Sequence, residues 1–147
     1  MKRVVFGWGN VARGDDALGP LLLERIAQAD WPDTILIEDY QLQLEHALDL
    51  QGADQALFID AGRNTPAPFH FSKIGPRPGL AHTSHALAPE SVLAVYEQTL
   101  GLKAPPSRLL CVRGERFELG EGLSAQGAAR LEAAWAFLQK VFAADCG

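Results

Sequence analysis

The feature that most constrains this chain is a regular alternation of short apolar runs with segments of helical periodicity. Runs rich in β-branched and aromatic residues, which are typical of strands, occupy residues 3–8, 33–40, 55–62, 69–74 and 107–114. Helical periodicity occupies residues 18–30, 41–53, 88–100 and 124–144. The alternation predicts a single α/β domain over residues 1–147 with three layers, in which a mainly parallel twisted sheet of about five strands lies between helices.

Two local features refine this expectation. The run at 69–74 lies in a region rich in Pro and Gly, so we expect it to form a short edge strand. Pro20 must fall in the first turn of the first helix, which places the start of that helix near Asp16 or Ala17.

Composition restricts the class of partner. The chain is 48% hydrophobic and 21% charged, the balance of a folded soluble domain, and it contains no apolar run long enough to span a membrane. A net charge of −5 argues against a nucleic-acid partner, which would need a basic face. Two cysteines, Cys111 and Cys146, are too few for a disulfide framework, so we expect a cytoplasmic protein. We interpret Cys111 as a small buried strand residue rather than a nucleophile.

The segment GWGNVARGDDALGP, residues 7–20, follows the first predicted strand. Its glycines match a relaxed dinucleotide-binding fingerprint, which makes a Rossmann-like nucleotide-binding module one alternative. Asp15 and Asp16 argue against it, because two carboxylates at the start of a helix repel a pyrophosphate that would bind there. Stabilisation of the helix N-terminus accounts for one of these two acids, but that role does not require both of them.

Further metal-ligating side chains follow later strands. In parallel sheets, ligands bind outside the carboxyl ends of the strands, where Asp60 follows the third apolar run. His82 and His85 lie in the loop HTSHALAPE. An acid after the first strand, Asp60 and His85 would form an O,O,N site suited to zinc or nickel. Alternatively, Asp60 is a turn residue and the histidines lie on the surface.

The segments VVFGWGNVARGDDALGP, LFIDAG and HTSHALAPE resemble, in order and spacing, the signature regions of the hydrogenase maturation endopeptidases. The resemblance covers almost the whole chain. It implies an endopeptidase that removes the C-terminal extension of a nickel-iron hydrogenase large-subunit precursor after nickel insertion. It further implies that Asp16, Asp60 and His85 are the metal-binding and catalytic residues. Nickel is then supplied by the precursor, and zinc or cadmium is expected to substitute in vitro.

The chain also departs from the family pattern. Many members carry Glu where this chain has the shorter Asp16, and Asp15 is expected to support the helix start or the loop. Many relatives have a glycine- and threonine-rich turn after the second strand, where this chain has Tyr40-Gln41-Leu42. The chain is similar in this respect to the branch serving soluble NAD-reducing hydrogenases. The residues expected to contact substrate are Gly9, Asn10, Gln41, Glu45 and His46, although Glu45 and His46 fit a solvated helix face equally well.

The sequence leaves the chemistry open. The metal could polarise the scissile carbonyl, or one aspartate could act as general base with nickel used only for recognition. A nonenzymatic nickel-binding accessory protein with the same ligands, and an unrelated metallopeptidase that keeps its own metal, are further alternatives. The predicted partner is the hydrogenase precursor, with no nucleic acid and no membrane, and the chain is expected to be a monomer.

Overall fold

The computed structural model describes residues 1–78 and 87–146, the last four of these by backbone alone. Five strands form one sheet in the order β2-β1-β3-β5-β4. All neighbouring pairs are parallel except β4 and β5, which are antiparallel. The strands are β1 (Arg3–Trp8), β2 (Thr34–Asp39), β3 (Gln55–Gly62), β4 (Phe69–Ile74) and β5 (Ser107–Arg113). The predictions of a mainly parallel five-stranded sheet and of an edge strand at 69–74 are confirmed.

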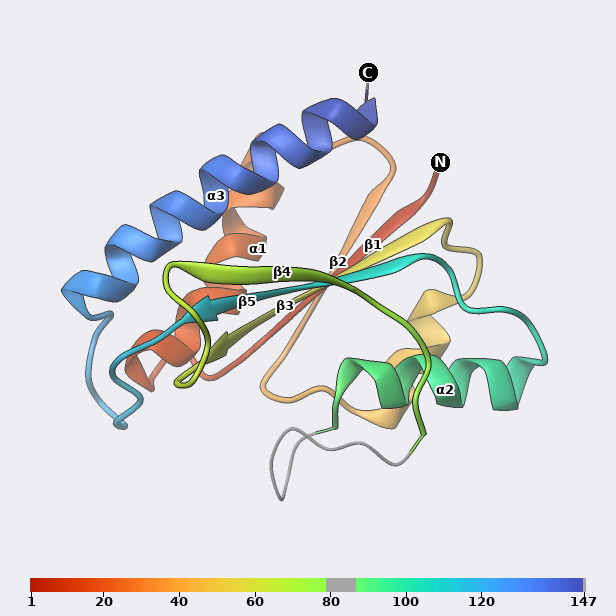
Figure 1. The fold of residues 1–147 in the computed structure, drawn as a ribbon, viewed down its shortest axis with the longest axis horizontal. Coiled ribbons are helices and arrows are strands. Elements are labelled where there is room, and N and C mark those ends of the chain that lie inside the picture. The colour runs from red at the N-terminus through yellow and green to blue at the C-terminus, as the bar shows by residue number, and fades with distance from the viewer. Residues whose placement is uncertain (79–86, 147) are drawn as a thin grey trace.

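Helices cover both faces of the sheet, as Figure 1 shows. The α-helices are α1 (Leu18–Ala29), α2 (Pro89–Leu100) and α3 (Ala125–Cys146), and the 3₁₀ segments are η1 (Gly14–Ala17) and η2 (Leu44–Leu50). Helices α1 and α3 pack on one face, and α2 with η2 packs on the other. The expected three-layer α/β arrangement is therefore present.

Each face of the sheet has its own apolar core, because successive side chains of a strand point to opposite faces. In β3, Leu57 and Ile59 pack toward α1 and α3, whereas Ala56 and Phe58 pack toward α2 and η2. The residue that follows in this alternation is Asp60, so its position in the strand places it on the α2 side of the sheet. Strands covered on both faces account for the nearly continuous apolar run of β3.

The first helix begins slightly later than its sequence pattern indicates. Gly14–Ala17 form a 3₁₀ turn, and the α-helix starts at Leu18 with Pro20 in its first turn. Proline is tolerated there because its missing N–H would have no intrahelical acceptor. Asp15 and Asp16 therefore lie in the turn that precedes the helix rather than in the helix itself.

The segment 41–53 forms less helix than its periodicity predicts. It contains only the 3₁₀ segment η2, flanked by Gln43 and Gln51, which both have extended backbones. The side chains of Gln43 and His46 form a reciprocal capping box that fixes the start of η2. The structure places η2 over the same face of the sheet as α2.

The strand order creates one crevice of particular interest. The chain moves from β1 to β2 on one side and then returns to β3 on the other side of β1. Such a reversal leaves a crevice outside the carboxyl ends of the two strands on either side of it, here β1 and β3. The loop 9–16 and Asp60 lie at these ends. Among the described residues, no helix is both long enough and apolar enough to cross a membrane.

Candidate functional site

The loop after β1 folds back onto the 3₁₀ turn that follows it. Gly9 has a φ of 146°, a conformation that favours glycine, and its N–H donates to the Asp39 carbonyl oxygen over 3.1 Å. A Cβ at Gly9 would overlap the backbone carbonyl oxygen of Asp16. Glycine at position 9 thus allows the loop to pack on itself, because the protein's own backbone fills the space beside its Cα.

Asp16 is held by this loop. Its Oδ2 accepts a 2.6 Å hydrogen bond from the N–H of Asn10, and its side chain is partly buried. Burial raises the pKa of Asp16 above its usual value, and the Asn10 N–H and the positive charge of Arg13 only partly oppose that rise. The carboxylate is therefore fixed in position but short of compensating positive charge.

Asp60 lies at the end of β3 and is close enough to interact electrostatically with Asp16. Its Oδ1 accepts the N–H of Ala61 at 2.8 Å. Burial raises the pKa of Asp60 to about 7, and the negative charge of Asp16 adds to the effect. The structure thus brings together the two carboxylates that the sequence places after the first and third strands, in surroundings that favour either a proton or a cation.

The predicted third ligand, His85, falls with His82 among residues 79–86, outside the described part of the chain. Within the described residues, no group of three His, Cys, Asp or Glu side chains is placed to hold a metal ion. The described part of the site is therefore the pair Asp16 and Asp60, whose chemistry suits a divalent cation.

Cys111 is a neighbour of this pair that sequence reasoning did not place at the site. It is the register partner of Asp60 on β5, and its Sγ is 2.9 Å from Oγ1 of Thr65. Burial raises the pKa of the Cys111 thiol, the hydrogen bond with Thr65 opposes the rise, and the charge of Asp60 adds to it. Only the register of β3 against β5 reveals this proximity, because the two residues are far apart in sequence.

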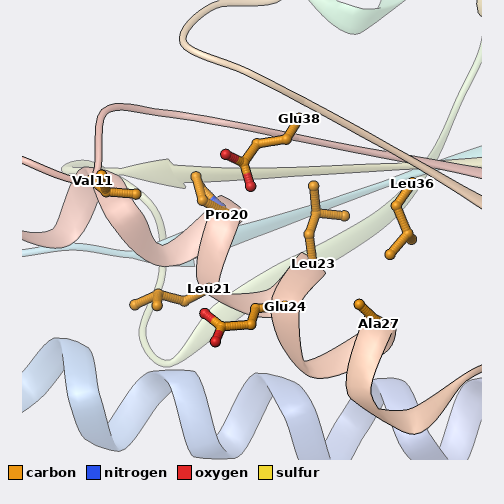
Figure 2. A pocket seen from close by; sticks show the side chains of 8 residues that line it. All are labelled: Val11, Pro20, Leu21, Leu23, Glu24, Ala27, Leu36 and Glu38. Carbon is orange, nitrogen blue, oxygen red and sulfur yellow. The ribbon is translucent and has the colours of Figure 1, made fainter.

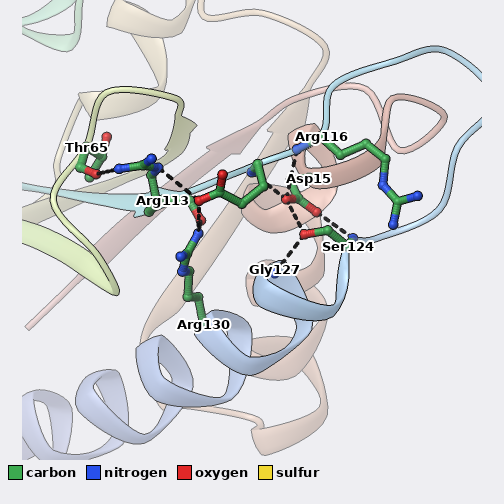
Figure 3. Close-up of polar contacts among 8 residues, drawn as sticks. Asp15, Thr65, Arg113, Arg116, Ser124, Gly127 and Arg130 are labelled. Atoms are coloured by element: carbon green, nitrogen blue, oxygen red, sulfur yellow. Dashed lines mark hydrogen bonds and ion pairs between the residues drawn. The ribbon is translucent and has the colours of Figure 1, made fainter.

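Asp15 has a different environment from Asp16, although the two are adjacent. Its side chain is fully buried and accepts four hydrogen bonds, which Figure 3 shows. The donors are the N–H groups of Glu115 (2.7 Å), Arg116 (3.2 Å) and Ser124 (2.8 Å), and the hydroxyl of Ser124 (2.6 Å). Burial acts to raise the pKa of Asp15, but these hydrogen bonds outweigh it and hold the pKa below its usual value.

These bonds join the site loop to the start of α3. Ser124 precedes α3, and its hydroxyl accepts the N–H of Gly127 at 2.9 Å, as an N-cap residue does. A Cβ at Gly127 would overlap the Asp15 carboxylate, so glycine is required for this close approach. Asp15 thus supports the loop, as expected, but the helix start that it stabilises is that of α3 rather than α1.

Backbone contacts strengthen the same junction. The loop 12–15 and the segment 116–121 exchange three backbone hydrogen bonds of 2.6–3.0 Å. They run from Asp15 N–H to Arg116 O, from Gly14 N–H to Glu121 O, and from Gly120 N–H to Ala12 O. Segment 114–124 is therefore the support on which the acidic loop rests.

A second polar cluster, also in Figure 3, joins β5 to α3 and to the loop after β3. Glu115 accepts from Arg130 at 2.7 Å and forms an ion pair with Arg113 at 3.2 Å. Arg113 also donates to the carbonyl oxygen of Thr65 at 3.0 Å. These contacts tie the loop that follows Asp60 to the same support as the loop that precedes Asp16.

The predicted substrate contacts divide into two groups. Gln41 and Glu45 are exposed, as a contact residue must be. His46 is buried, and both ring nitrogens have partners: Nδ1 accepts the N–H of Gln43 at 2.8 Å, and Nε2 is 3.3 Å from Oδ2 of Asp39. These contacts account for His46 without a substrate.

Gly9 and Asn10, also predicted to contact substrate, make contacts within the loop. Gly9 packs against Asp16, and Asn10 donates its N–H to the Asp16 carboxylate and accepts the N–H of Ala12 on its side-chain oxygen at 2.9 Å. Their contact with a substrate stays a prediction.

The fold is that of the hydrogenase maturation proteases. No family model matches the chain, and no curated protein matches it in sequence. Among solved structures, it is similar to the hydrogenase maturating endopeptidase HybD from E. coli, with a TM-score of 0.80 and 20% identity over 99% of this chain and 94% of that one. It is also similar to the [NiFe] hydrogenase maturation protease HycI from Thermococcus kodakarensis KOD1, with a TM-score of 0.73 and 23% identity over 95% and 91%.

We predict that Asp15→Ala destabilises the protein by about 3–5 kcal/mol, because it leaves the buried N–H and hydroxyl of Ser124 and two partly buried backbone N–H groups without their acceptor. Urea denaturation measures the free energy of unfolding. Asp49→Ala, at an exposed aspartate, is the matched control and should change it by less than about 0.5 kcal/mol. Equal effects of the two substitutions would contradict the anchoring role of Asp15.

A second prediction concerns pH. Because the pKa of Asp60 is raised to about 7, the folded protein keeps this proton between pH 4 and pH 7 while the unfolded chain has released it. The contribution of Asp60 to stability therefore falls as the pH rises through that window. Asp60→Asn should raise the free energy of unfolding by about 1–3 kcal/mol at pH 8 and by much less at pH 5. The same difference at both pH values, measured by urea denaturation, would show that the carboxyl titrates normally.

Proposed function

We propose that this protein is an endopeptidase that removes the C-terminal extension from the large-subunit precursor of a nickel-iron hydrogenase. The observation that carries the proposal is the pair Asp16 and Asp60, set at the reversal of strand order in the fold of the hydrogenase maturation proteases. Ligands of open α/β sheets bind at such a position.

The similarity to known proteases extends over nearly the whole domain. The solved structures named above cover 95–99% of this chain, and a hydrogenase 2 maturation peptidase from Thaumarchaeota archaeon SCGC_AB-539-E09 covers 97% with a TM-score of 0.70. These names describe a protease, an endopeptidase and a peptidase of hydrogenase maturation. The same activity is the simplest proposal for a chain that shares the fold and places two acids at the expected crevice.

In this proposal nickel arrives with the precursor, as part of the substrate. The two carboxylates suit a cation, because burial leaves both with a raised pKa and their charges repel each other. His85 would complete the ligand set, and zinc or cadmium would replace nickel in vitro. Bound nickel would supply positive charge beside the scissile carbonyl. A precursor without nickel would lack this attraction and be passed over.

The residues of the chain itself supply positioning and proton transfer. Asp16 is oriented by the Asn10 N–H, so its carboxylate meets the incoming cation without rearranging. Without a cation, burial raises the pKa of Asp60 to about 7, so nickel binding would release this proton and leave the carboxylate ionised. An ionised aspartate of the pair would then take the proton from the attacking water and return it to the leaving amine. The protein would act in the cytoplasm as a monomer.

The test is the processing of purified precursor by Asp16→Asn, a substitution that keeps the size of the side chain and removes its charge. We expect at least about a 100-fold loss of cleavage rate, because the carboxylate no longer binds the cation of the substrate. Cleavage is followed by the mass of the large subunit, and circular dichroism verifies that the variant is folded. Asp49→Asn serves as the matched control and should cleave normally.

Three results would contradict the proposal. Normal cleavage by Asp16→Asn would remove Asp16 from the site. Equal cleavage of nickel-free and nickel-loaded precursor by the wild-type protein would remove nickel as the recognition element. Binding of nickel-loaded precursor without any shortening would identify a nonenzymatic accessory protein instead.

A further inference from the structure

A hollow of about 440 Å³ lies between α1 and the edge strand β2, beside the acidic loop, and Figure 2 shows its lining. Apolar side chains line most of it, and the carboxylates of Glu24 and Glu38 are the charged groups of the lining. The apolar residues are Val11, Pro20, Leu21, Leu23, Ala27 and Leu36.

The backbone beside this hollow is an open strand edge. Strand β2 is the last of the sheet, and among the described residues it pairs only with β1. The carbonyl oxygens of Asp33 and Asp39 accept hydrogen bonds from Arg3 and Gly9, so the odd-numbered residues of β2 direct their N–H and C=O groups toward β1. Because these directions alternate along a strand beside a parallel neighbour, Leu36 and Glu38 direct theirs outward. Leu36 and Glu38 thus direct their backbone groups away from the sheet, and their side chains line the hollow.

The negative charges at the hollow favour a ligand with a basic side chain. Glu24 and Glu38 are both exposed, and within the described part of the chain no hydrogen bond or ion pair engages the Glu38 carboxylate. Glu24 interacts with the charge of Arg25, but that guanidinium already donates to Glu132 at 2.8 Å and 2.9 Å. A lysine or arginine of a partner would therefore meet two carboxylates that the fold leaves available.

The hollow adjoins the loop that holds Asp16. Val11 on its rim is 61% exposed and directly follows Asn10, whose N–H holds the Asp16 carboxylate. A peptide lying along β2 is therefore led toward the carboxyl end of β1, where the acid pair lies. An open strand edge, an apolar hollow and two exposed acids together match the way extended peptides add to sheets, in which the backbone supplies affinity and alternate side chains supply specificity.

We propose that β2 is an exosite for the substrate, where an extended segment of the precursor adds to the sheet as a further strand. An aliphatic side chain of that segment fills the hollow, and a lysine or arginine pairs with Glu24 and Glu38. This inference rests on the proposed function, since it takes the hydrogenase precursor as the occupant.

The first experiment measures KM and kcat for cleavage of nickel-loaded precursor by the Glu24→Lys/Glu38→Lys double variant. We expect KM to rise about tenfold at low salt with little change in kcat, and the difference to shrink at high salt. The Glu24→Gln/Glu38→Gln variant should give a smaller rise in the same direction. Asp49→Lys, at an exposed acid away from the hollow, should leave both constants unchanged. An unchanged KM in a double variant that cleaves normally would overturn the exosite.

The second experiment measures amide hydrogen exchange. In the Asp16→Asn variant, which should leave added precursor largely uncleaved, the outward amides of Leu36 and Glu38 should become protected by the precursor, and adding the two lysine substitutions should abolish this protection. Protection that depends on the concentration of the protein alone, with a dimer in sedimentation, would show that a second copy occupies the edge, and would overturn the proposal. Failure of the wild-type protein to cleave precursor at all would refute the proposed function instead, so the two failures are distinguishable.

Discussion

The candidate site of this protein depends on one buried carboxylate, that of Asp15, and on the hydrogen bonds that it accepts. Asp15 is removed from water and surrounded by donors of the segment 115–124, and this joins the loop after β1 to the start of the last helix. A buried carboxylate without these donors would strongly destabilise the fold, so its position is strictly determined. The position of Asp16, the next residue, follows from it, because the 3₁₀ turn shared by the two residues leaves the neighbouring carboxylate little freedom.

The three acids of this region illustrate how environment separates groups of the same chemistry. Asp15 is surrounded by donors and stays ionised, with a pKa below its usual value. Asp16 and Asp60 are partly buried and near each other, and their pKa values rise. The first acid therefore contributes to the stability of the fold, whereas the charged forms of the other two are disfavoured by burial and by each other. Perturbed pKa values of this kind often mark functional sites.

The sequence predicted the fold well, because strand and helix periodicities differ and the chain alternates between them. It also placed Asp60 correctly near the carboxyl end of the third strand, because a lone charged residue that follows an apolar run seldom lies within the core. What it did not predict depends on contacts between distant segments. The donors to Asp15 come from residues about a hundred positions away, and no local sequence pattern predicts them. The proximity of Cys111 to Asp60 needs the register of β5, and the burial of His46 needs the position of η2.

The anchoring of the acidic loop also bears on the order in which the chain is synthesised. The loop is made early, but Ser124, which supplies two of the four hydrogen bonds to Asp15, is among the last residues before α3. A nascent chain that has not reached this residue holds its loop by fewer contacts. The acid pair therefore acquires its final geometry only after Ser124 has been synthesised.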